Sequence, residues 1–240
     1  MTTPARGEWL VELRSAPAGV LHGPWPDEER RGARVVALCA VTDAAVVLGS
    51  AQAPDVLDAG RVRDAGLDVV RRGSGGGAVL VAPDAQVWID LWLPRRDPLW
   101  DDDVITSSWW VGEAWTRVLA ALGVPGARRH AGRAEAGPWG TVLCFAGLGP
   151  GEVTVGGAKV VGVAQRRTRQ GARLHTMVPR RWDPVALAGV LARPPSREAL
   201  EVLRGVATGI DELLAAQGGS GVAAERVLDA VVRELALLSS

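Results

Sequence analysis

Short apolar segments in two groups, separated by one long helical pattern, constrain the fold of this chain most. The first group covers residues 35–38, 46–49, 67–71, 78–81 and 86–93, and the second covers residues 142–145, 152–155, 159–165 and 173–178. Between them, Trp110, Ala114 and Val118 recur at helical spacing in a pattern that runs from 104 to 122. Because strands and helices do not alternate one by one, the sequence predicts an α+β fold with mixed, largely antiparallel sheets flanked by helices.

The remaining segments predict how this fold is organised along the chain. Residues 78–81 and 86–93 flank a Pro83-Asp84 turn and predict a hairpin, and residues 56–65 predict a short helix. Residues 1–32 include Pro17, Pro24 and Pro26 and predict an irregular N-terminal segment, whereas residues 185–240 predict a helical tail of the same domain. The glycine-rich stretch 218–221 lies too near the end to separate a domain, so we expect one domain over residues 1–240.

Charge and composition exclude several functional classes. The chain has 27 basic and 27 acidic residues, which gives no bulk electrostatic case for binding nucleic acid or an anionic membrane. The sequence shows neither a signal peptide nor an apolar stretch of membrane-spanning length, so a cytoplasmic protein is expected. Two cysteines and three histidines show no metal-ligand spacing, and Asp101, Asp102 and Asp103 before the long helix are typical of helix capping.

Lys159 is the only lysine of the chain, against 26 arginines, and it lies in a stretch bracketed by glycines at 156, 157 and 162. A lysine carries a compact ammonium with three rotatable donors, whereas an arginine presents a planar fork that stays protonated. A catalytic or phosphate-contacting amine needs those properties, although one surface lysine could also remain by chance. The neighbouring motifs must therefore decide between these interpretations.

The segment 71–79 reads Arg-Arg-Gly-Ser-Gly-Gly-Gly-Ala-Val. Successive glycines let backbone amides approach a ligand closely and hold an anion, and the two arginines favour anion binding further. The segment lacks the Gly-Lys-Ser/Thr ending of a nucleotide-binding P-loop, and a strand rather than a helix is expected after it. A flexible hairpin loop is the structural alternative.

Three segments of the chain resemble the lipoate-protein ligases and their octanoyltransferase relatives, within the biotin/lipoate ligase superfamily. They are the glycine loop at 71–79, the Gly-x-Lys-x-x-Gly-x-Ala-Gln-Arg-Arg segment at 157–167 and the turn at 48–54. The resemblance covers roughly residues 35–235 and places Lys159 at the position of the family's essential lysine. It implies that substrate or adenylate is bound by Gln52, Arg72, Ser74, Gly75, Gly76, Gly77, Ala78, Val79, Gly162, Ala164 and His175.

The resemblance implies an enzyme that attaches lipoate, or a related medium-chain acid such as octanoate, to a lysine of a lipoyl domain through an acyl-adenylate. ATP with Mg²⁺ would be the co-substrate, without a tightly bound metal. The acceptors would be apo lipoyl domains of 2-oxoacid dehydrogenase complexes or the glycine-cleavage H protein.

Two alternatives stay open. Cys144 precedes Lys159 by fifteen residues, as in the octanoyltransferase branch, where a cysteine takes octanoate from acyl carrier protein as a thioester. Cys144 and Phe145 could equally be core packing. The family's histidine after the Ala-Val of the glycine loop is missing here, which suggests a non-catalytic acyl-binding protein, and His175 could be purely structural.

Overall fold

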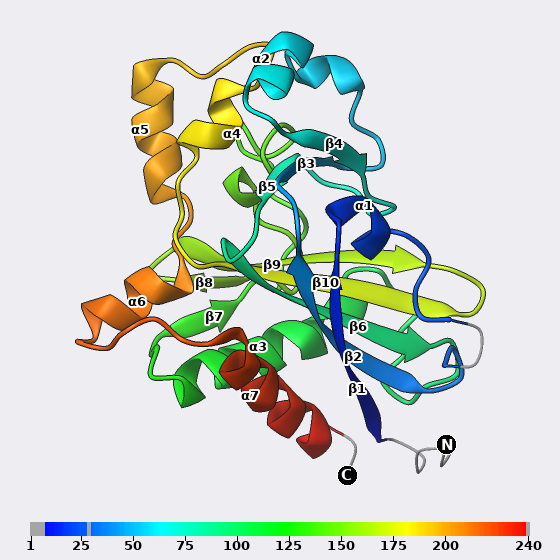
Figure 1. The fold of residues 1–240 in the computed structure, drawn as a ribbon. Helices are drawn as coiled ribbons and strands as arrows, with labels where there is room; N and C mark the ends of the chain where they lie inside the picture. The colour runs from blue at the N-terminus through cyan, green and yellow to red at the C-terminus, as the bar shows by residue number, and fades with distance from the viewer. Residues whose placement is uncertain (1–7, 28–29, 239–240) are drawn as a thin grey trace.

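A large sheet of seven strands forms the centre of the computed structural model, which describes residues 8–27 and 30–238 (Figure 1). Only its first two strands, β1 and β2, run parallel to each other; every other neighbouring pair is antiparallel. In sheet order the strands are β1 (Trp9–Ala16), β2 (Arg34–Val41), β6 (Gln86–Pro94), β10 (Gly171–Pro179), β9 (Ala158–Arg167), β8 (Val153–Val155) and β7 (Ala127–Arg129).

A second, three-stranded sheet lies above the first in the view of Figure 1. Its central strand pairs parallel with one neighbour and antiparallel with the other. In order, its strands are β4 (Asp68–Arg71), β3 (Ala45–Leu48) and β5 (Val79–Val81). The predicted α+β class with largely antiparallel sheets is therefore confirmed.

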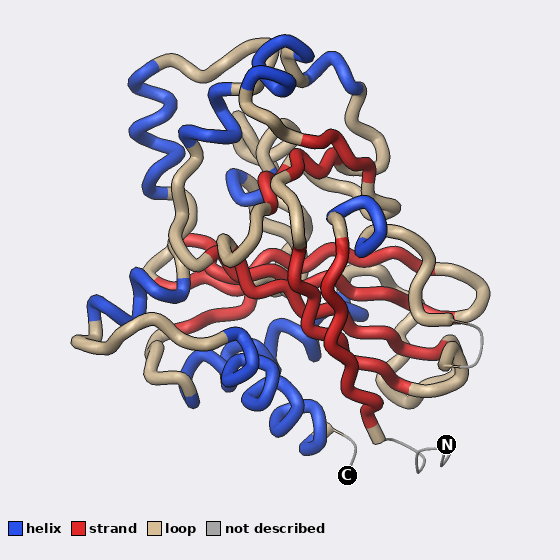
Figure 2. The backbone as a smooth tube through the Cα atoms, in the orientation of Figure 1, coloured by secondary structure: helices blue, strands red, loops and turns tan. Residues whose placement is uncertain are grey.

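Helices cover the outer faces of both sheets (Figure 2). The two long helices α3 and α7 pack on the lower face of the large sheet, where Trp115 and Val231 belong to its main hydrophobic cluster. The α-helices are α1 (Ala18–Leu21), α2 (Ala59–Asp64), α3 (Trp109–Ala121), α4 (Val185–Gly189), α5 (Arg197–Gly205), α6 (Ile210–Ala216) and α7 (Ala224–Leu237). Short 3₁₀ helices are η1 (Pro54–Val56), η2 (Thr106–Ser108) and η3 (Cys144–Ala146).

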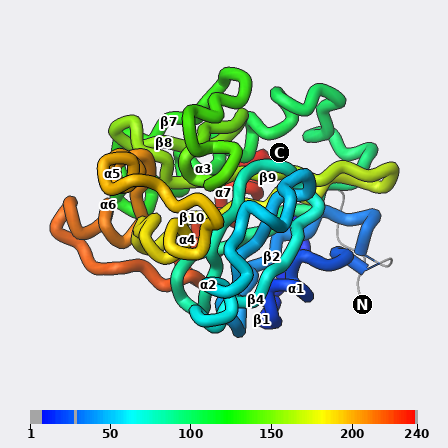
Figure 3. Tube along the Cα trace, turned by 90° about the horizontal axis from the view of Figure 1, so that it is seen from above, coloured from blue at the N-terminus to red at the C-terminus, as the bar shows by residue number. Residues whose placement is uncertain are grey.

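The space between the two sheets is filled by a second cluster that includes Trp88 and Trp92 of β6 and Leu21 of α1. A third cluster joins the small sheet to α2, α4 and α5. Seen from above, α4 and α5 lie toward one side of the molecule, and α1 and β1 lie toward the other (Figure 3). Within the described part of the chain, no helix combines the length and apolar character needed to cross a membrane.

Three local predictions are wrong. Residues 1–32 are not irregular throughout, since Trp9–Ala16 forms an edge strand and Ala18–Leu21 a short helix. The edge strand is stabilised by parallel pairing with β2, a contact that the local sequence does not indicate. Segments β5 and β6 do not form a hairpin, because β5 pairs with β3 and β6 pairs with β2 and β10. Residues 142–145 do not form a strand but lead into η3.

The expected helix over 104–122 is shorter at its start. The helix α3 begins at Trp109, after a turn in which the Asp103 carboxylate accepts hydrogen bonds from the amides of Ile105 and Thr106. The predicted capping role of the aspartate run is wrong for the helices, because neither η2 nor α3 has a side-chain cap hydrogen bond; Asp103 instead fixes the turn that precedes them. Helix α6 lies within the predicted helical tail, although no separate helix was expected at residues 210–216.

Candidate functional site

A cavity of about 590 Å³ opens where the glycine loop, the 130–152 segment and β9 meet. Seven of the predicted site residues line it, as does Glu152, to which the sequence assigned no role. The seven are Gln52, Gly75, Gly76, Gly77, Cys144, Lys159 and Ala164. Their direct contact with a substrate stays a prediction.

Arg72 supports the glycine loop, and Arg71 supports the neighbouring turn. The Arg72 guanidinium is buried and donates to the carbonyls of Gly75 and Gly77, at 2.7 and 2.8 Å. Arg71 donates to the carbonyls of Gly49 and Gln52 in the neighbouring turn. Arg72 donates to the protein's own backbone here, and its predicted contact with substrate or adenylate stays a prediction.

This arrangement leaves the amides of the loop available. The carbonyls of Gly75 and Gly77 point to Arg72, and no hydrogen bond between described residues uses the amides of residues 75–77. Gly76 has a φ of +95°, a conformation that glycine adopts without steric cost. Free amides on a cavity wall can cradle an anion, as the sequence predicted.

Close backbone contacts fix the position of the loop. A Cβ on Gly77 would lie 2.7 Å from the backbone of Leu143, and a Cβ on Gly49 would lie 2.0 Å from the Gly76 carbonyl oxygen. The Gln52 side chain joins the same parts, because it accepts from the Gly49 amide and donates to the carbonyl of Thr141. The turn at 48–54 therefore supports the cavity wall as well as lining it.

Other predicted residues support the site from outside the cavity. Ala78 exchanges backbone hydrogen bonds with Val142 and Cys144, and Val79 begins β5. Ser74 is buried, and its carbonyl accepts from the Ser50 amide. A Cβ on Gly162 would lie 3.2 Å from the Phe145 ring, so this glycine admits the ring beside Lys159. The backbone and packing contacts of these four residues support the cavity wall, and their contact with a substrate stays a prediction.

The Lys159 ammonium lies at the cavity wall among three oxygen atoms. Its Nζ is 2.9 Å from the Cys144 carbonyl oxygen, 3.0 Å from that of Gly147 and 2.7 Å from a carboxylate oxygen of Glu152. It also lies 4.9 Å from the centre of the Phe145 ring. Lys159 lines the same cavity as the glycine loop and Cys144.

His175 is turned away from the cavity into a buried polar cluster. It pairs with Ala164 across the sheet, but its Nδ1 lies 2.7 Å from Oδ1 of Asp90. Arg173 and Trp88 donate to the same carboxylate. His175 is not part of the cavity lining, and its contact with Asp90 favours the structural alternative over the predicted substrate contact.

The charges of this cluster balance inside the protein. Burial is the largest single influence and raises the pKa of the Asp90 carboxyl, but Arg173 and His175, through charge and hydrogen bonds, together outweigh it and hold that pKa well below its ordinary value. Burial lowers the pKa of His175. Burial, and next the proximity of His175, lower the pKa of His22 to about 3. Both histidines are therefore neutral near pH 7.

The cysteines are free, as predicted: Cys39 is buried and Cys144 is partly exposed. Cys39 lies 3.6 Å from an oxygen of Asp90, and burial raises the pKa of its thiol, as suits an unreactive core residue. Among the described residues, no three histidine, cysteine, aspartate or glutamate side chains are grouped to hold a metal ion.

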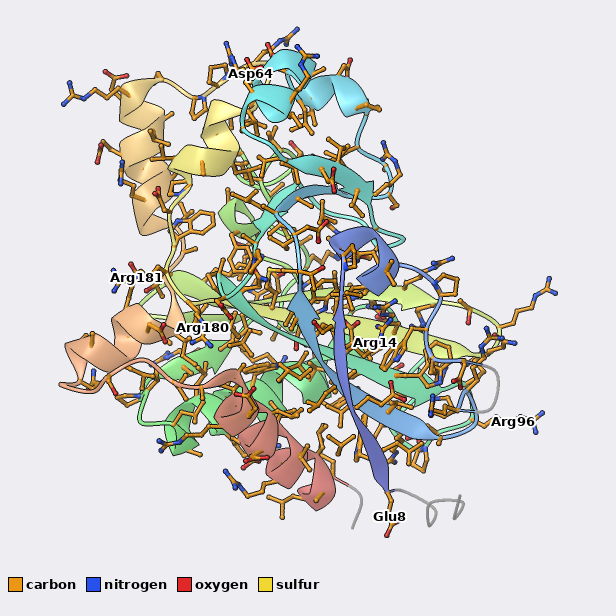
Figure 4. The ribbon with its side chains drawn as sticks, in the orientation of Figure 1. Glu8, Arg14, Asp64, Arg96, Arg180 and Arg181 are labelled. Carbon is orange, nitrogen blue, oxygen red and sulfur yellow. The ribbon has the colours of Figure 1, made fainter. Side chains whose placement is uncertain are left out.

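The paired arginines elsewhere serve mainly the fold. Arg180 lies beside α6 (Figure 4), where it donates to the Val222 carbonyl and pairs with Asp211. Arg167 donates to the carbonyl of Asp102. Arg96 points outward from the molecule (Figure 4). Arg180 and Arg167 therefore make internal contacts.

A family model described as the lipoyl protein ligase A/B catalytic domain matches residues 28–236. The chain belongs to this family. By sequence comparison, no curated protein matches it. The family resemblance drawn from the glycine loop and the lysine segment is confirmed.

Solved lipoate-protein ligases share the fold at low identity. A bi-partite lipoate protein ligase from Thermoplasma acidophilum, studied with its E2 lipoyl domain, aligns with a TM-score of 0.68 and 18% identity, over 95% of this chain and 82% of that one. Lipoate-protein ligase A bound with ATP gives the same TM-score and identity, over 95% and 83%. A T. acidophilum ligase structure with bound lipoic acid gives 0.67 and 18%, over 95% and 83%.

Proposed function

We propose that this lipoate ligase family member attaches lipoate, or a related medium-chain acid, to a lysine of a lipoyl domain through an acyl-adenylate. One observation carries the proposal: the Lys159 ammonium and the unused amides of residues 75–77 line the same cavity. The bound ATP and lipoic acid of similar structures support the choice of substrates. Mg²⁺ would enter with ATP, and no tightly bound metal is expected.

The residues would act by positioning and charge stabilisation. The amides of Gly75, Gly76 and Gly77 would hold the phosphate of the adenylate, which carries the negative charge. Lys159 would contact the acyl oxygen and the phosphate, where charge develops as the incoming amine displaces AMP. Acyl transfer then requires the acceptor lysine to reach the open side of the cavity.

We propose apo lipoyl domains of 2-oxoacid dehydrogenase complexes, or the glycine-cleavage H protein, as acceptors. The lipoyl domain studied with the T. acidophilum ligase supports this class of partner. The proposal also includes a single catalytic domain acting in the cytoplasm, with neither nucleic acid nor a membrane as partner.

A second candidate is octanoyl transfer from acyl carrier protein through Cys144. The specific observation in its favour is that the Cys144 side chain lines the cavity together with Lys159, and a Cβ on Gly76 would lie 3.9 Å from its sulfur. A thioester formed there would face the glycine loop. The contact of Lys159 with the carbonyl of Cys144, however, does not involve the thiol.

One experiment separates these functions from a non-catalytic protein. Purified protein is mixed with apo lipoyl domain and offered either lipoate with ATP and Mg²⁺, or octanoyl-carrier protein without ATP, and the acceptor mass is read. Modification only in the first mixture supports the ligase, and modification only in the second, lost in Cys144→Ser, supports the transferase. An unmodified acceptor in both mixtures contradicts both and favours an acyl-binding protein.

A further inference from the structure

The Lys159 ammonium has no free donor in this structure. An ammonium carries three N–H groups and no lone pair. Its three acceptors are the carbonyls of Cys144 and Gly147 and the carboxylate of Glu152, all within 3.0 Å. Lys159 is only 3% exposed, although it lies at the wall of the cavity. The site therefore fits the charged form of this side chain in both number and position of partners.

Glu152 is itself held in place. One of its carboxylate oxygens accepts from the Gly149 amide at 2.6 Å, and the other accepts from the Val163 amide at 3.1 Å. The residue is 4% exposed. Because both oxygens are fixed by backbone groups, the carboxylate cannot follow the ammonium if that moves, and its negative charge stays beside residue 159.

The need for this arrangement follows from the proposed function, on which the inference rests. The reaction delivers an activated acyl group to a lysine amine, and the protein's own single lysine lies in the same cavity. A neutral amine is a nucleophile, whereas an ammonium is not. The 26 arginines do not compete, because a guanidinium stays protonated.

We infer that Glu152 is a positioning residue that keeps Lys159 as an ammonium and so prevents the enzyme from acylating itself. The reaction that it prevents is fully defined. The Lys159 nitrogen would attack the acyl carbon, the bond from that carbon to the phosphate oxygen would break, AMP would leave, and the nitrogen would release a proton to water. The same contact keeps the positive charge that stabilises acyl transfer to the acceptor.

The test uses the fact that Lys159 is the only side-chain amine. Folded protein is treated with the N-hydroxysuccinimide ester of acetic acid, and acetylation of Lys159 is followed by peptide mass, with the N-terminal amine as internal standard. We expect Glu152→Gln to be labelled at Lys159 at least about tenfold faster than the wild type, because the buried ammonium has lost its counter-charge.

Glu135→Gln is the matched control, since Glu135 also lines the cavity and the structure shows no contact between it and Lys159. Its labelling rate should equal that of the wild type. Glu152→Asp keeps the charge on a shorter side chain and should react at an intermediate rate; it carries the test if Glu152→Gln does not fold. Labelling at the wild-type rate in the folded Glu152 variant overturns the inference.

A second arm links the inference to function. Each protein is incubated without acceptor in two separate samples, one with lipoate, ATP and Mg²⁺ and one with octanoyl-carrier protein. The intact mass of the protein is then measured after hydroxylamine treatment, which removes thioesters. We expect a stable acyl adduct on Lys159 in Glu152→Gln and none in the wild type. Faster acetylation without any acyl adduct, in a protein that also leaves apo lipoyl domain unmodified, would refute the proposed function and leave the role of Glu152 intact.

Discussion

Two clusters of charged residues in this protein are similarly buried but differ in what surrounds them. Around Lys159, the partners are two carbonyls and one carboxylate, and one side opens to the cavity. Around Asp90, the partners are the side chains of Arg173, His175 and Trp88, in the space between the two sheets. The first cluster can exchange a contact for a substrate atom, whereas the second satisfies its members within the fold. Only the first is suited to chemistry.

The largest effect is expected where the closed cluster loses its carboxylate. Asp90→Asn leaves the Arg173 guanidinium buried without its counter-charge, so the free energy of unfolding should fall by about 3–5 kcal/mol. Urea denaturation of the folded variant measures this. Asp102→Asn, which removes an exposed partner of Arg95, is the control and should leave the denaturation midpoint unchanged. Equal effects of the two variants would remove the distinction between the clusters.

The next effect concerns activity. Lys159→Arg should lower kcat/KM for acceptor acylation by about 10²–10³-fold, because a larger, planar guanidinium cannot converge its donors on three oxygens around one point, as the compact ammonium does. The measurement is the rate of acyl transfer to apo lipoyl domain, with lipoate plus ATP and with octanoyl-carrier protein as donors. Arg197→Lys, on the outer helix α5, is the control. Wild-type activity in Lys159→Arg would refute the assignment of the open cluster as the active site.

A smaller effect tests how the open cluster is supported. Gly77→Ala places a Cβ 2.7 Å from the Leu143 backbone and should reduce the free energy of unfolding by about 1–3 kcal/mol. Gly75→Ala, two residues away, meets no atom within 4 Å and should leave stability unchanged. Thermal unfolding followed by circular dichroism compares them. If the two variants lose equal stability, the position of the glycine loop does not depend on its packing against residues 143–144.

At neutral pH the smallest effect is expected from the titration of the closed cluster, which changes stability only on acidification. The pKa of His22 is about 3 in the fold and about 6.5 in an unfolded chain, so between these values the unfolded state binds more protons. The contribution of His22 to the free energy of unfolding should thus be complete above pH 6.5. It should fall with acidification, by at most about 1.4 kcal/mol per pH unit. Denaturation at several pH values should show a flatter dependence for His22→Gln. A His130→Gln control should retain the wild-type slope, and parallel curves for all three proteins would contradict the prediction.

The sequence by itself determined the family, the fold class and the centre of the site. The glycine loop, the Gly-x-Lys segment and the early turn are local patterns, and their residues Gln52, Gly75 and Lys159 do meet at one cavity. Glycines permit particular backbone paths wherever they occur, and apolar periodicity selects strands or helices from neighbours in the chain alone. Such local signals can be interpreted without knowing which distant residues pack against the segment.

Only the tertiary structure decided which motif residues face the cavity. His175 belongs to the same resemblance as Lys159, but Asp90, 85 residues away, draws it into the core. Arg72 donates to a carbonyl of its own loop, and β5 pairs with β3 in the second sheet instead of forming the expected hairpin. The pairing of β8 with β9 places Glu152 beside Lys159. Burial and the choice of partner depend on contacts distant in sequence, so a local pattern cannot specify them.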